Sequence, residues 1–200
     1  QSVPDLVLRA ATLIDGTGIE PVRPGEVTIR NGMLATTGSP VTPEDDAEVI
    51  EYGNATILPG LIDAHVHLQF TAGPDHPTTR TAHINASDSE RIATAIGNAQ
   101  KGLVTGVTTM RDTGGYLTLN MDVRDAIDDG HVAGPRLLVC GAPITTTAGH
   151  LHWCGLRADS QEEVVAAVRE MVEAGADFVK VMATGGMMTP GSSPGMTQYS

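Results

Sequence analysis

After Pro59 the sequence alternates between strand-like and helix-like segments, and this alternation constrains the fold more than any other feature. Strand candidates lie at residues 61–66, 106–110, 136–140 and 177–182, with helical patterns at 87–102, 121–129 and from 160 onward. Successive strands that are separated by helices pair in parallel, because a parallel crossover needs about a dozen residues or more. Four such units in a row predict an α/β fold, either a (β/α) barrel or an open doubly wound sheet.

The helix that follows Ser160 has the clearest boundary signals. Ser160 and Glu163 have the spacing of a capping box, in which each side chain binds a free backbone N–H group of the other residue. Gly175 marks the end of the helix. The apolar residues between them repeat on one helical face, as expected of a helix packed on a core: Val164, Val165, Val168, Met171 and Val172.

The first 58 residues contain strand signals only. Residues 26–30 alternate between apolar and polar side chains, and Asn31–Gly32 follows them, a dipeptide typical of tight hairpins. Residues 47–52 alternate again. We therefore expect residues 1–58 to form the N-terminal part of a small β-sandwich and residues 59–200 to form a separate α/β domain.

Composition excludes several classes of function. The net charge of -12 argues against nucleic-acid binding, which requires basic patches. No apolar run is long enough for a transmembrane helix, so no membrane partner is expected. Two cysteines are too few for a disulfide scaffold and favour a reducing compartment. We expect a cytoplasmic location, although the first residue is Gln1, which indicates a processed N-terminus.

The motif His65-Val66-His67 ends the first strand of the α/β domain. Residues two apart on a strand point to the same side, so both imidazoles can bind one metal ion, and Zn²⁺ is the first expectation. The carboxyl ends of barrel strands form the active-site face, which suits this position. The alternative is a pair of partly exposed histidines without a ligand, and the apolar strand around them favours the metal.

Lys180 lies within the apolar fourth strand candidate, Phe178-Val-Lys-Val-Met182. Burial favours the neutral amine of a lysine, which is reactive. Taken by itself, however, such a lysine more often packs its stem and extends its amine to the strand end. Asp112, at the end of the second strand candidate, either orients a metal ligand or caps the following loop, and we favour the cap.

The segment from Thr145 to Cys154 follows the third strand candidate, where barrel enzymes bind substrate. His150 is the candidate substrate-binding residue there, and an ordinary loop histidine is an equal alternative. A zinc site made of Cys140, His150, His152 and Cys154 fits no compact zinc motif and is disfavoured. The loop at 187–200 is rich in Gly, Pro and Ser, and it contributes Tyr199 as a second candidate for substrate contact.

Several stretches together resemble the amidohydrolase superfamily, in its imidazolonepropionase-like and Xaa-Pro dipeptidase-like branch. The matching residues are Leu58-Pro-Gly-Leu-Ile-Asp-Ala-His-Val-His67, Gly106-Val-Thr-Thr-Met-Arg-Asp112, Gly134-Pro-Arg136, Gly149-His-Leu-His152 and Phe178-Val-Lys-Val-Met-Ala-Thr-Gly-Gly186. This resemblance implies a (β/α)8 TIM-like barrel of which the chain holds the first four βα units, preceded by the β-sandwich.

The resemblance also implies the chemistry. His65 and His67 would bind one of one or two divalent metal ions, most simply Zn²⁺, and a carbamate on Lys180 would be a further ligand. A metal-bound hydroxide would attack the carbonyl of a C–N bond in an amide, dipeptide, carbamate or urea. The alternative function is a catalytically inactive amidohydrolase-like scaffold or assembly subunit, and a nucleotide-dependent enzyme is disfavoured because no phosphate-binding loop follows the first strand.

The family pattern needs more than this chain contains. Two further histidines and the catalytic aspartate would lie on later strands, so no catalytic residue is expected here. A complete barrel has roughly 250 residues, so the remaining half must come from the same chain or a second one. We expect a small amide or dipeptide as substrate and a homo-oligomer as the assembly.

Overall fold

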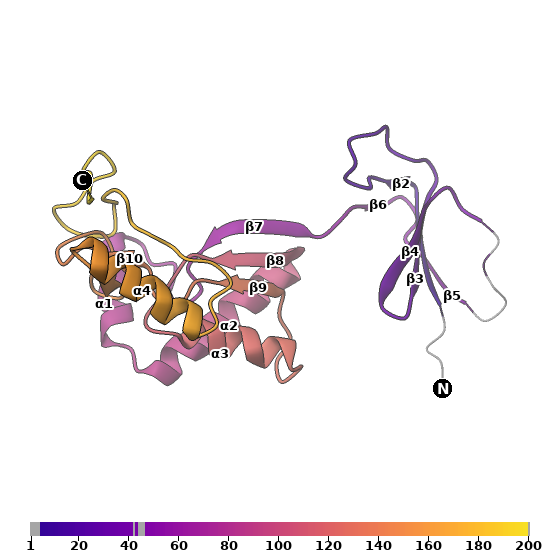
Figure 1. Cartoon of the computed structure of the whole chain (residues 1–200). Helices are drawn as coiled ribbons and strands as arrows, with labels where there is room; N and C mark the ends of the chain where they lie inside the picture. Colours follow the sequence, from indigo (N-terminus) through magenta and orange to yellow (C-terminus); the bar gives the residue numbers. More distant parts are fainter. Residues whose placement is uncertain (1–4, 42, 44–46, 200) are drawn as a thin grey trace. The chain divides into compact units, whose positions relative to one another are not determined.

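The computed structural model describes residues 5–41, 43 and 47–199, and the chain divides into two compact units, Gln1–Pro59 and Gly60–Ser200 (Figure 1). The first unit is built from strands. Its main sheet has the order β4-β3-β1-β5, and a separate pair joins β2 to β6. The bounds are β1 Leu6–Ala10, β2 Thr12–Leu13, β3 Gly25–Arg30, β4 Met33–Gly38, β5 Glu48–Glu51 and β6 Thr56–Ile57.

The predicted hairpin joins β3 to β4, which pair in antiparallel fashion. Asn31 and Gly32 have φ angles of 51° and 74°, as a two-residue turn with two left-handed positions requires. Val7 and Ala10 of β1 and Val27 of β3 are buried, and Leu13 of β2 is buried as well. The β-rich character expected of residues 1–58 is therefore confirmed within the described residues.

The second unit is an α/β structure with a parallel sheet in the order β7-β8-β9. The strands are β7 Leu61–Val66, β8 Val107–Asp112 and β9 Arg136–Val139, close to the predicted positions. The helices are α1 His76–Asn85, α2 Asp88–Val104, α3 Leu119–Asp128 and α4 Gln161–Glu173. Capping boxes form at Ser87 with Glu90 and at Ser160 with Glu163. Helix α1 was not predicted, because its sequence is mostly polar and lacks an apolar stripe.

The main core lies between this sheet and its helices, and α2 and α3 cover one face of the strands (Figure 1). Met110 of β8 and Val139 of β9 point into it, together with Ala95 and Ala99 of α2. The opposite face is different, because Ile62 of β7 is 72% exposed and Leu138 of β9 is 41% exposed. That uncovered face corresponds to the interior side of a barrel wall, where strand side chains normally meet one another.

The fourth strand predicted at residues 177–182 does not form as a regular strand. The segment still follows β9: the backbone of Asp177 donates to Val139, and a single parallel bridge joins Val181 to Ile144. The ladder between these points is interrupted because Gly141 turns the chain at a φ of 69° and Pro143 has no N–H group to donate. Short strands β10 Ile144–Thr145 and β11 Leu156–Arg157 pair after this break.

The prediction of four strand–helix units is therefore only partly correct. Three strands are each followed by a helix, and the fourth segment is followed by turns and loops up to residue 199. Among the described residues, no helix is both long and apolar enough to cross a membrane.

Candidate functional site

Four of the five predicted site residues line one pocket at the carboxyl end of the parallel sheet. The pocket has a volume of about 270 Å³ and is lined by His65, His67, His150 and Lys180 together with residues 181–185. These residues come from β7, from the loop after β10 and from the irregular fourth segment. The parallel sheet brings them together because its strands end at the same edge.

The two histidines of the HxH motif lie side by side. Their ring centroids are 5.5 Å apart with an angle of 63° between the planes. His65 is exposed and its backbone N–H donates to the carboxylate of Asp63. Burial lowers the pKa of His65, and the charges of Lys180 and Arg111 lower it further. The lowered pKa favours the neutral ring, which is the form in which imidazole binds a metal.

The orientation of His67 is set by the backbone of the loop after β8. Its Nδ1 lies 2.7 Å from the carbonyl oxygen of Gly114, and a carbonyl only accepts, so Nδ1 carries the hydrogen. Nε2 is then left with its lone pair, as a metal ligand requires. Thr113 Oγ1 lies 3.4 Å from Nε2 but donates to Val66 O at 3.0 Å. Burial lowers the pKa of His67 to about 4, so the ring is neutral near pH 7.

Asp112 holds the same loop from beneath. Its side chain is fully buried, and Oδ1 accepts from the backbone N–H of Gly114 at 3.1 Å. Burial raises the pKa of Asp112 to about 6, although hydrogen bonds from Gly114, Leu68 and Asn120 act in the opposite direction. The carboxylate thus caps the loop, as favoured from the sequence, and through Gly114 it also supports His67.

Lys180 and His150 complete the pocket from the other side. Lys180 is half-buried, and its backbone oxygen accepts from Ile144. The backbone N–H of His150 donates to Gln198 Oε1 at 2.6 Å, and its buried Nδ1 has no hydrogen-bond partner among the described residues. Burial lowers the pKa of His150, and the charges of Lys180 and His76 add to that effect.

Tyr199, the fifth predicted site residue, does not line this pocket. Its hydroxyl donates to the carbonyl of Ala158 at 3.0 Å, and it lines a different pocket with Ser160 and Val164 of the α4 region. The neighbouring Gln198 is the residue that reaches the His150 loop.

Three aromatic residues that sequence reasoning missed support the site. Phe70 stacks on His67 with ring centroids 5.0 Å apart and an angle of 15° between the planes. His83 of α1 meets Phe70 edge-on at 4.7 Å, and Trp153 lies 5.4 Å from Phe70. Their rarity was the one signal in the sequence that could have pointed to them. The chain has only two Phe and one Trp, and one Phe and the Trp lie at this site.

The donor set fits part of a metal site. Within residues 5–41, 43 and 47–199, no three His, Cys, Asp or Glu side chains are grouped closely enough to hold a metal ion. His65 and His67 would supply two nitrogen ligands, and Lys180 lines the same pocket. The alternative zinc site has no support, because Cys140 and Cys154 are both buried and burial raises the pKa of the Cys140 thiol to about 12.

Comparison with known proteins identifies the family. The sequence model of the amidohydrolase family matches residues 56–200. The chain belongs to the amidohydrolase family. An ochratoxinase from Aspergillus niger is 29% identical over 222 residues, covering 97% of this amidohydrolase chain and 45% of that protein. An imidazolonepropionase from Photobacterium profundum is 37% identical over 73 residues, covering 32% of this chain and 18% of that protein.

Solved amidohydrolase structures have the same fold over nearly the whole chain. The crystal structure of A. niger ochratoxinase gives a TM-score of 0.82 at 27% identity, covering 100% of this chain and 51% of that one. A Xaa-Pro dipeptidase with bound methionine in its active site gives a TM-score of 0.84 at 26% identity, covering 98% and 51%. This amidohydrolase chain therefore spans about half the length of these relatives.

Proposed function

We propose that this chain is part of a metal-dependent hydrolase that cleaves a C–N bond. One observation carries the proposal: His65, His67 and Lys180 line one pocket, and the Nδ1–H of His67 is bound to Gly114 so that Nε2 is free to bind. Membership of the amidohydrolase family supports the same reaction class. The remaining ligands and the proton-transferring aspartate would come from the other half of the barrel, in the same or a second chain.

His65 and His67 would hold one divalent metal ion, with Zn²⁺ the first choice because neutral imidazoles suit it. A neutral amine on Lys180 would add CO₂, forming the N–C bond of a carbamate and releasing one proton, and the resulting anion would be a third ligand. When bound, a metal of this kind polarises a substrate carbonyl and lowers the pKa of water.

His150 would orient the substrate. Its ring lines the same pocket as the two histidines, and its buried Nδ1 is unsatisfied, so a hydrogen bond from or to substrate would remove the cost of that burial. Tyr199 stays a weaker candidate, because its hydroxyl would first have to leave Ala158. Dipeptides and other small amides are the proposed substrates, and similarity to a Xaa-Pro dipeptidase supports the dipeptides.

The test measures metal content and turnover in the intact protein and its His65→Ala variant. We expect native mass spectrometry of the intact protein to show bound metal and a CO₂-sized mass that is lost on denaturation. His65→Ala should lose metal and lower the hydrolysis of a dipeptide panel by at least about 100-fold, as expected when a metal ligand is removed. His131→Ala, an exposed histidine outside the pocket, is the matched control.

Retained hydrolysis in His65→Ala would contradict the proposal. An intact protein that assembles normally, binds no metal and hydrolyses none of the panel would instead favour the scaffold function.

A further inference from the structure

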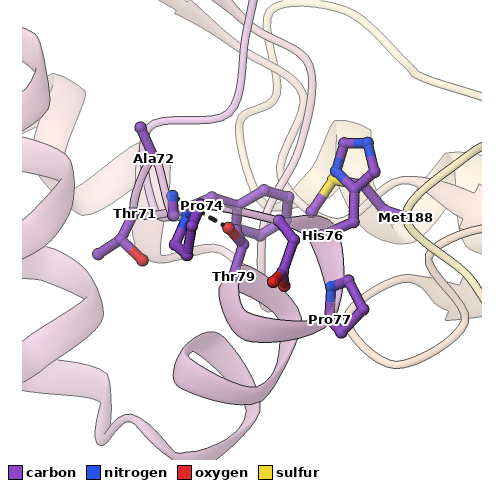
Figure 2. A pocket seen from close by; sticks show the side chains of 10 residues that line it. Thr71, Ala72, Pro74, His76, Pro77, Thr79 and Met188 are labelled. Atoms are coloured by element: carbon purple, nitrogen blue, oxygen red, sulfur yellow. Dashed lines mark hydrogen bonds between the residues drawn. The ribbon is translucent and has the colours of Figure 1, made fainter.

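A second and larger pocket lies beside the candidate metal pocket. It has a volume of about 610 Å³, within the range of small-molecule sites. Figure 2 shows Thr71 and Ala72 at one end of it, and His76, Pro77 and Met188 at the other. The wall residues come from the loop between β7 and α1 and from the first turn of α1, except for Met188, which follows the fourth segment.

This pocket adjoins the proposed site through one side chain and one loop. Phe70 lines the larger pocket and also stacks directly on His67. The loop after residue 182 borders both pockets, because Gly185 lines the smaller one and Met188 lines the larger one. The two pockets are thus neighbours that share the Phe70–His67 contact and one loop.

Most of the pocket wall is apolar, which favours an uncharged ring. Phe70, Pro74, Pro77 and Met188 supply apolar surface, and a methionine sulfur packs well against an aromatic ring. The one carboxylate, that of Asp75, is engaged in capping α1, where it accepts from the N–H of Thr78 at 2.7 Å. Among the residues that line the pocket there is no Lys or Arg, and His76 is the one imidazole.

The loop is also built to keep its shape. Asp75 caps α1, Pro77 lies in its first turn, and the Gly73 N–H donates to Thr79 Oγ1 at 3.2 Å, the bond drawn in Figure 2. A Cβ atom at Gly73 would lie 2.7 Å from Thr79 Oγ1, so a larger residue there would have to displace that hydroxyl. A preformed pocket binds a rigid ring at a lower entropic cost than a mobile loop does.

We propose that this pocket is a substrate subsite that binds an uncharged aromatic group attached to the scissile amide. The inference rests on the proposed function for its place in the reaction, but the binding itself is measurable without turnover.

The experiment follows the methyl resonance of Met188 by NMR in the intact protein with ¹³C-labelled methionine, assigned with Met188→Leu. Benzamide is the probe. We expect benzamide to shift the Met188 methyl signal in a saturable way, with the same shift in Thr81→Phe. Ala72→Phe should abolish the shift, because an exposed side chain on the pocket wall is enlarged into the cavity. Thr81 is an exposed α1 residue outside this pocket and is the matched control.

Hydrolysis of Ala-Ala, Phe-Ala and Ala-Phe gives the second measurement. Ala72→Phe should lower kcat/KM for at least one aromatic dipeptide by about tenfold or more and leave Ala-Ala within twofold. Absence of a Met188 shift in the unmodified protein, or a shift that persists in Ala72→Phe, would overturn the subsite. A normal shift without hydrolysis of any dipeptide would overturn the proposed dipeptidase function and leave the subsite standing.

Discussion

At the residue scale, the buried side chain of Asp112, which holds the loop after β8, makes the stability of the fold depend on pH. Its pKa is raised from 3.8 to about 6 by burial, so the folded state binds the proton more tightly than the unfolded state does. This tighter proton binding stabilises the folded state at low pH, and the stabilisation is lost as the pH rises from about 4 to about 6. The loss amounts to about 3 kcal/mol at roughly 1.4 kcal/mol per pKa unit.

Asp112→Asn should remove this contribution while keeping an oxygen that accepts from Gly114. We expect the stability of the variant relative to the unmodified protein to improve by about 3 kcal/mol between pH 4 and pH 7. Urea unfolding at both pH values measures it. Identical pH profiles for the two proteins would show that Asp112 titrates normally.

Gly186 is a second residue with a testable role, because the ring of His150 packs closely against it. A Cβ atom there would lie 2.5 Å from the ring of His150, so Gly186→Ala must displace that ring. If His150 orients substrate, kcat/KM should fall by about 10- to 100-fold, since small displacements in a site are costly, while metal content stays unchanged. Gly195→Ala, with open space around its Cβ position, should be unaffected. Equal kinetics for the two variants would remove His150 from the substrate site.

At the scale of elements, α4 depends on its capping box. The Ser160 side chain accepts from the backbone N–H of Glu163 at 3.2 Å, and the Glu163 carboxylate accepts from that of Ser160 at 3.1 Å. Ser160→Ala should lower the free energy of unfolding by about 1 kcal/mol, measured by urea denaturation. Ser160→Thr keeps the hydroxyl and should retain most of the stability. A loss of equal size in both variants would point to packing rather than capping.

At the scale of the whole molecule, the uncovered face of the parallel sheet should drive association. Ile62 of β7 and Leu138 of β9 are 72% and 41% exposed on this face, and burying one such side chain contributes about 1.5–3 kcal/mol. The 200-residue chain expressed alone should therefore self-associate, and Ile62→Lys should weaken association by about tenfold or more. Sedimentation velocity at several concentrations measures it. Val104→Lys alters an exposed residue at the end of α2 and should leave association unchanged. If both variants weaken association equally, the sheet face is not the surface through which the chains associate.

The sequence by itself determined the parts of this protein that depend on local signals. The hairpin at Asn31–Gly32, the cap at Ser160 and the strands β7 to β9 were predicted from turn, capping and periodicity patterns, because each signal involves residues close in the chain. The choice of His65 and His67 also came from adjacent residues.

Only the tertiary structure decided what depends on distant residues. It interrupted the pairing of the fourth segment with the chain after β9, where Gly141 and Pro143 lie, and it separated Tyr199 from the candidate metal pocket. It packed Phe70 against His67, and His83 and Trp153 against Phe70. It also tied His67 to Gly114, 47 residues away. Such contacts follow from how strands and loops pack at one edge of the sheet, and no spacing pattern along the chain encodes them.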